Sequence, residues 1–169
     1  MTEIFTKQTM RVGLLFGGLV AAVTLVLDII NLIPFLICIT WVLYLVNWVF
    51  LLVGGYANGY VHGFTKENMS SNLKKAIGAG LWAALIMGVL NGILAVVFLF
   101  VTPTAYFGYV ASPGILSIVS TLIGTVVGAL ISGLFWFIVG GIVYPYYPVS
   151  NLPASIVRFF DRVKAFASK

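Results

Sequence analysis

Polar side chains that could take part in chemistry are scarce in this chain, and four of them lie within long apolar stretches. Asp28 and Asn31 lie near the start of LVLDIINLIPFLICITWVLYLV (25–46), and Asn47 and Asn91 lie in later apolar runs. A carboxylate or an amide in hydrocarbon is costly unless it is paired, so such groups mark solute or proton paths or contacts between helices. These four residues are the candidate polar or transport residues.

Two roles are open for Asp28, the only acidic residue outside the basic segments described below. It could contact an ion, a proton or a substrate, or it could belong to a turn and accept hydrogen bonds there. Asn47 and Asn91 are expected at similar depths in the membrane. A hydrogen bond between them would join two helices and contribute about 0.6 kcal/mol; the alternative is that they line a polar path.

A second polar group occurs in GGYANGYVHGF (54–64). If this segment is helical, Asn58 and His62 lie one turn apart, as do Tyr56 and Tyr60, which predicts a polar and aromatic patch at the edge of the membrane. One histidine and one cysteine cannot form a bis-histidine or multi-cysteine site within a single chain. Motifs of nucleophilic hydrolases, zinc proteases and P-loops are absent from the sequence. We therefore expect no catalytic residues, no metal, no cofactor and no enzymatic activity.

The elements that carry these residues follow from an extreme composition. Of 169 residues, 62% are hydrophobic and 8% are charged, whereas soluble domains carry roughly 25% charged residues. A helix needs about 20 residues to cross the hydrocarbon. The apolar region 12–56 is about twice that long and contains Pro34, so it predicts two spans joined by a turn. We expect an all-α integral membrane protein forming one domain (1–169), a four-transmembrane-helix bundle with spans at about 12–31, 34–57, 76–101 and 115–143.

The segments between the expected spans place all the positive charge on one side. TKENMSSNLKK (65–75) and TPTAYFGYVASP (102–113) are expected to be loops. With four spans, all nine lysines and arginines fall in the N-terminus, the 65–75 loop and the C-terminus, on the same side of the membrane. The positive-inside rule then predicts that both termini are cytoplasmic. The net charge of +5 favours contact with anionic lipid headgroups, and we find no nucleic-acid-binding module.

The C-terminal segment SIVRFFDRVKAFASK predicts an amphipathic helix at about 154–168. Its apolar face consists of Ile156, Phe159, Phe160, Val163 and Phe166. The basic residues expected at the membrane surface are Arg158, Arg162, Lys164 and Lys169. We expect this helix to lie in the cytoplasmic interface of the membrane. Docking on a partner subunit is the alternative.

Small residues recur at every fourth position in or beside each expected span. In lipid, such residues let helix backbones approach closely. The glycines of this pattern are Gly13, Gly17, Gly55, Gly59, Gly63, Gly80, Gly88, Gly92, Gly124 and Gly128. We expect them to pack the chain's own helices, although one or two stripes could face another subunit. Each half of the chain also has a glycine-striped span and a Val-Gly-Gly triplet (53–55 and 139–141), a faint sign of a parallel repeat.

These features together favour a small non-catalytic accessory or structural subunit of a larger membrane complex, packed through glycine-striped helices. The alternative is a small homo-oligomeric transporter or channel for an ion or small solute. In that case Asp28, Asn31, Asn47 and Asn91 would line the path. The expected partners are the lipid bilayer and either other membrane subunits or further copies of the chain.

Overall fold

The computed structural model describes residues 4–33, 42–107 and 113–169, with side chains described to residue 101 in the second range. The described residues form helices and no strand. The long helices are α1 (Lys7–Asn31), α3 (Leu45–His62), α4 (Met69–Phe107) and α5 (Ile115–Val143). Two short 3₁₀ turns (Lys66–Asn68 and Val149–Asn151) and the helix α6 (Ala154–Ser168) complete them.

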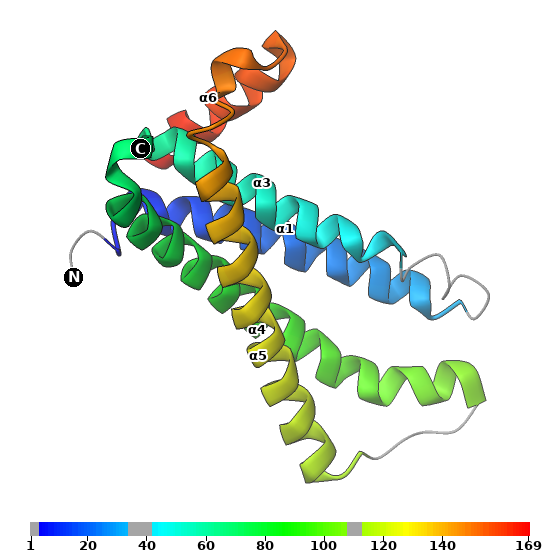
Figure 1. Ribbon diagram of the computed structural model, residues 1–169. Coiled ribbons are helices and arrows are strands. Elements are labelled where there is room, and N and C mark those ends of the chain that lie inside the picture. Colours follow the sequence, from blue (N-terminus) through cyan, green and yellow to red (C-terminus); the bar gives the residue numbers. More distant parts are fainter. Residues whose placement is uncertain (1–3, 34–41, 108–112) are drawn as a thin grey trace.

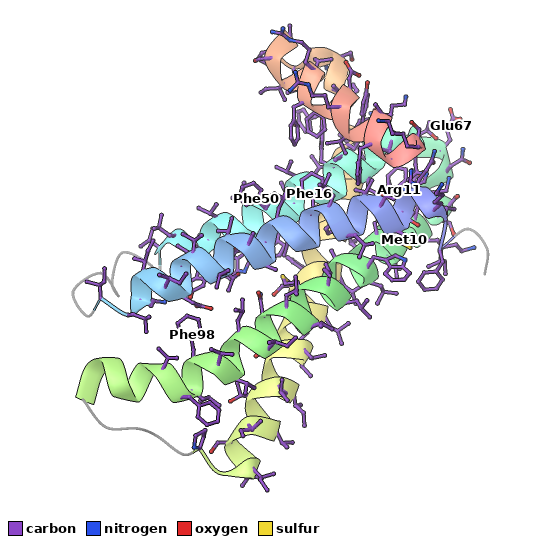
Figure 2. The ribbon with its side chains drawn as sticks, turned by 180° about the vertical axis from the view of Figure 1, so that it is seen from behind. Met10, Arg11, Phe16, Phe50, Glu67 and Phe98 are labelled. Carbon is purple, nitrogen blue, oxygen red and sulfur yellow. The ribbon has the colours of Figure 1, made fainter. Side chains whose placement is uncertain are left out.

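The long helices are arranged as two antiparallel pairs (Figure 1). Helix α1 lies beside α3, and α4 packs against both α1 and α5, while α5 also packs on α3. The start of α1, the link between α3 and α4, and helix α6 all lie at one end of the bundle, which we call the basic end. Figure 2 shows Arg11 and Glu67 there. Away from the basic end the two pairs of helices diverge (Figure 1).

Three of the helical segments are long and apolar enough to cross a membrane: Lys7–Asn31, Lys66–Val101 and Ile115–Val143. The expectation of an all-helical protein with membrane-spanning helices is thus confirmed for the described residues. The described part of the expected second span is α3, which has 18 residues and contains Asn47, Asn58 and His62. Because these polar residues lower its mean hydropathy, α3 is not among the three. The expected turn at Pro34 lies outside the described residues.

Two segments that we expected to be loops are partly helical. Helix α4 begins at Met69 rather than near residue 76, and it continues to Phe107 rather than ending near residue 101. At its start, the Asn72 amide donates to the carbonyl oxygen of Thr65 (2.6 Å) and so ties the first turn to the preceding link. At its far end, Pro103 removes only one backbone donor, which a long helix tolerates. Polarity in the first segment and a proline in the second were therefore poor markers of the helix ends.

Glycines place helix backbones in direct contact in the half of the bundle nearer the basic end. A Cβ atom added to Gly17 would lie 2.5 Å from the carbonyl oxygen of Ala83, on α4. One added to Gly55 would lie 2.3 Å from the carbonyl oxygen of Phe137, on α5. Gly13 and Gly59 are similarly tight, an added Cβ at Gly80 would lie 3.0 Å from the carbonyl oxygen of Gly133, and Gly88 and Gly92 make ordinary or slightly close contacts. These contacts join α1 to α4, α3 to α5 and α4 to α5.

Three glycines of the expected stripes have other surroundings. Gly63 ends α3 in the left-handed conformation, at φ 61°, and an added Cβ there would meet nothing within 4 Å. Its role is to end the helix, because glycine adopts this conformation without steric cost. Gly124 and Gly128 on α5 also have no atom within 4 Å of an added Cβ. They therefore take no part in packing within the described chain.

Helix α6 packs on the protein's own α1 and α3. Phe160, Val163 and Ala167 are buried against these helices, and the Tyr60 hydroxyl donates to the Asp161 carboxylate (2.6 Å). The expected apolar face is therefore divided: Phe160 and Val163 turn inward, and the side chains left exposed are Ile156, Phe159 and Phe166. Our two alternatives for this face, lipid or a partner subunit, both overlooked docking within the chain. The cause is the aromatic surface that Tyr56 and Tyr60 offer to Phe160, at ring distances of 5.2 and 6.1 Å.

The close contact of α1 with α4 predicts opposite outcomes for two adjacent glycines. Gly17→Ala places a methyl group 2.5 Å from a backbone oxygen, whereas Gly18→Ala meets nothing within 4 Å. Overpacking of this kind costs about 1–3 kcal/mol. We expect Gly17→Ala to lower the unfolding temperature in detergent and Gly18→Ala to leave it unchanged or raise it. An equal response of the two variants would contradict the contact.

Candidate functional site

A cavity of about 440 Å³ lies between α1, α3, α4 and α5. Small-molecule sites typically measure about 300–1,000 Å³ and combine apolar walls with a few polar groups. Much of the wall is apolar here too, with Val20, Leu51 and Met87 among its residues. The described polar residues that line it are Thr24, Tyr44, Asn47, Asn91, Thr125 and Ser132. The cavity thus gathers polar side chains from all four long helices.

The cavity is closed towards the basic end. Leu51 lines it, and the next turn of α3 carries Gly54, where an added Cβ would lie 2.7 Å from the Phe137 ring and 2.8 Å from the Phe16 ring. Leu51, Phe16 and Phe137 are all fully buried. Figure 2 shows Phe16 on α1. These large side chains fill the space between the cavity and the basic end. The polar side chains of the cavity therefore do not extend towards that end.

Asn47 and Asn91 both line this cavity but do not bond to each other as expected. The Asn47 Nδ2 donates instead to the Thr24 hydroxyl (3.0 Å) and so joins α3 to α1. The reason is the rotation of α3, which packs mainly against α1 and α5 and only slightly against α4. The amide oxygens of Asn47 and Asn91 are buried without a hydrogen-bond partner among the described residues. The two asparagines therefore share a cavity rather than a hydrogen bond.

Asp28 and Asn31 are joined by a residue that the sequence analysis did not single out. The Tyr44 hydroxyl donates to the Asp28 carboxylate, and the Asn31 Nδ2 donates to the Tyr44 oxygen (3.1 Å). Tyr44 is the N-cap residue of α3, so this group ties α1 to α3 at the end away from the basic end. Tyr44 also lines the cavity, whereas Asp28 and Asn31 are not among its described lining residues. The carboxylate thus adjoins the cavity through Tyr44.

The sequence contained one signal for the missed hydroxyl residues. Thr24, Asp28 and Asn31 are spaced four and then three residues apart, which places them on one face of α1. That polar face, in the part of α1 that is otherwise apolar beyond Arg11, marks Thr24 as a member of the site. Thr125 and Ser132 are likewise seven residues apart on one face of α5. Tyr44 gave no comparable signal, because tyrosine is common near membrane interfaces.

The expected patch at the basic end is divided between two faces of α3. Asn58 is fully buried, and its Nδ2 donates to the carbonyl oxygen of Lys75 on α4 (3.3 Å). Tyr56 and Tyr60 instead face α6 and the Tyr144 ring, at 5.3 and 6.3 Å. The His62 ring stacks on Phe64 at 6.2 Å. These contacts connect α3 to α4 and to α6, and the four residues form no single pocket.

Metal-binding groups are not assembled in the part of the chain that the structure describes: no three histidine, cysteine, aspartate or glutamate side chains come together there. Comparisons with protein-family models, with curated proteins and with solved structures find no match. The fold and the site therefore define a class, an all-helical membrane protein with a largely apolar cavity between its helices that carries a few polar groups. They do not connect it to a known family.

The link between Thr24 and Asn47 predicts a measurable coupling. In a double-mutant cycle with Thr24→Val and Asn47→Ala, we expect an interaction free energy of about 0.6 kcal/mol, and at most about 1.7 kcal/mol. The same cycle for Asn47→Ala and Asn91→Ala is the control and should give a value near zero. Unfolding in mixed detergent measures both. A larger coupling for the two asparagines would restore the contact expected from the sequence.

Proposed function

We propose that the protein is a small non-catalytic accessory or structural subunit of a larger membrane complex, which it joins through one face of α5. The observation that carries this proposal is the free small-residue stripe Ser120, Gly124 and Gly128. Ser120 is exposed, and an added Cβ at Gly124 or Gly128 would meet nothing within 4 Å. The stripes of the other helices are largely occupied in packing within the chain.

The physical basis of the proposal is the way helices associate in lipid. The hydrophobic effect does not draw apolar helices together there, so close backbone approach at small residues supplies the packing energy. The large neighbours of Gly124 and Gly128 on α5, Ile123 and Val127, are 59% and 47% exposed. A partner helix that packs over the glycines would also cover these branched side chains.

We further propose that the chain crosses the membrane four times, with both termini in the cytoplasm. In support, α3 runs back along α1, so the start of α1, the link before α4 and helix α6 lie together at the basic end. Together with the first two turns of α4 and Lys169, these segments carry all nine lysines and arginines, which favours a cytoplasmic location. The exposed Ile156, Phe159 and Phe166 of α6, beside its arginines, fit contact with anionic headgroups.

Transport by a homo-oligomer is the second candidate, and the cavity lined by Asn47 and Asn91 favours it. Phe16, Leu51 and Phe137 weigh against it, because these buried side chains occupy the level between the cavity and the basic end. A conducting path through one chain would need them to separate. The subunit proposal requires no such rearrangement.

The proposed interface predicts that Gly124→Leu weakens assembly without harming the fold. We expect native mass spectrometry of the gently extracted protein to show a fixed-stoichiometry complex with other chains, which this variant loses. Gly18→Leu on α1 is the control, because an added Cβ there is equally free; it should retain the complex. Both variants should unfold at the wild-type temperature. A complex that survives Gly124→Leu would contradict the interface, and an assembly of identical chains alone would favour transport.

The proposed topology predicts which positions react from the same side of the membrane. In a chain with Cys38→Ala, single cysteines at Lys7, Ser71 and Ser168 should be labelled by an impermeant maleimide only from the cytoplasm. Ser117→Cys should be labelled only from the opposite side. If α3 does not cross, Lys7→Cys and Ser71→Cys will react from opposite sides.

A further inference from the structure

The cavity between the four long helices is lined by two asparagines whose buried amide oxygens the described residues leave unused. Asn47 and Asn91 line it from α3 and α4, and neither amide oxygen has a partner. Asn47 is only 9% exposed, and its nitrogen is already bonded to Thr24. An unsatisfied acceptor in apolar surroundings is costly, so a buried group of this kind calls for a donor.

We propose that this cavity binds a neutral amphipathic molecule from the bilayer, whose hydroxyl groups donate hydrogen bonds to Asn47 and Asn91. This site adjoins the proposed α5 face at Gly128, but binding of the ligand does not require the proposed assembly. Rotation about the soft χ2 torsion of asparagine can turn the buried Asn91 amide oxygen towards a molecule in the cavity. At Asn47 the same rotation exchanges the bond to Thr24 for one to the ligand. Because the unused atoms are acceptors, the ligand must carry O–H or N–H donors rather than only carbonyl or ether oxygens.

The charge and polarity of the wall restrict the ligand further. None of the described residues that line the cavity is charged, and an unpaired charge in such surroundings is strongly disfavoured. A neutral head therefore fits better than a phosphate, a carboxylate or an ammonium group. The apolar side chains of Val20, Leu51 and Met87 are suited to the hydrocarbon part of the same molecule. A monoacylglycerol or a long-chain alcohol has this combination.

The exposed part of the wall indicates where such a molecule enters. Leu45 and Trp48 on α3 line the cavity and are 48% and 46% exposed, and Gly128 on α5 is exposed as well. These residues belong to helices that pack side by side, while Phe16 and Phe137 close the level towards the basic end. The mouth therefore lies along α3 and α5, on a surface that faces lipid if both helices are spans. This favours a bilayer amphiphile over a solute from water.

Photolabelling of the full chain in phosphatidylcholine nanodiscs tests the proposal. The probe is a long-chain alkanol with a diazirine in its tail, and a diazirine alkane of equal length without the hydroxyl is its matched comparison. We expect the alkanol to label α3 and α5 residues at the cavity more strongly than the alkane. Asn91→Leu should weaken alkanol labelling about three- to tenfold, in line with one hydrogen bond in a membrane protein. It should leave alkane labelling unchanged.

Two glycine variants separate filling of the cavity from a change at the protein surface. Gly128→Leu adds a side chain at the cavity wall, whereas Gly124→Leu lies one turn away and is not among the lining residues. We expect the first to abolish alkanol labelling and the second to leave it unchanged. Because Gly124→Leu is also the assembly variant, an intact cavity with a lost complex, or the reverse, tells the two proposals apart. If Asn91→Leu does not fold, Asn47→Leu provides the same test.

Competition identifies the source of the hydroxyl group. Displacement of the probe by a monoacylglycerol in the nanodisc, but not by glycerol in the buffer, supports the bilayer ligand. Displacement by glycerol alone would overturn the bilayer source. Equal labelling by alkanol and alkane, with no effect of Asn91→Leu, would overturn the site and leave a cavity whose amides are satisfied by water.

Discussion

The other features depend on one constraint: in the half of the bundle nearer the basic end, glycines lie directly against the backbones of neighbouring helices. Gly17 holds α1 on α4, and Gly55 with Gly140 holds α3 on α5, where an added Cβ at Gly140 would lie 2.1 Å from the carbonyl oxygen of Leu52. Such contacts leave no room for helix rotation. They fix which face of each helix looks inward, and therefore which polar groups reach the cavity. Beyond them the helix pairs diverge (Figure 1), and the cavity occupies part of the space that results.

The sequence predicted the helical class well because its main signal is length. The uncharged, largely apolar run of 115–143 coincides with α5, and 154–168 coincides with α6. Composition says little about helix ends in polar segments, so the early start of α4 at Met69 was missed. That α3 is the fourth span remains a prediction. Asn58 and His62 lower its mean hydropathy, and span counts rely on that quantity.

Two of the polar residues that line the cavity, Asn47 and Asn91, were singled out from the sequence, but their hydrogen-bond partners were not. Depth along a span placed Asn47 and Asn91 at similar levels, and both do line one cavity. Depth says nothing about rotation around the helix axis, however, and rotation decides that Asn47 bonds to Thr24. The partner of Asp28 was unpredictable for a related reason. Tyr44 is distant from Asp28 in sequence, and only the packing of α3 on α1 brings them together.

The docking of α6 has a consequence for the order in which the protein can mature. The Arg11 guanidinium donates to the carbonyl oxygen of Phe166 (3.3 Å). The first described helix, α1, is therefore in contact with the last one, α6. During synthesis, α1 and α3 are made well before α6 leaves the ribosome. Until then the surface of Tyr56 and Tyr60 that Phe160 covers in the folded chain is left open. Occupation of that surface by α6 therefore comes only after every other described helix has been made.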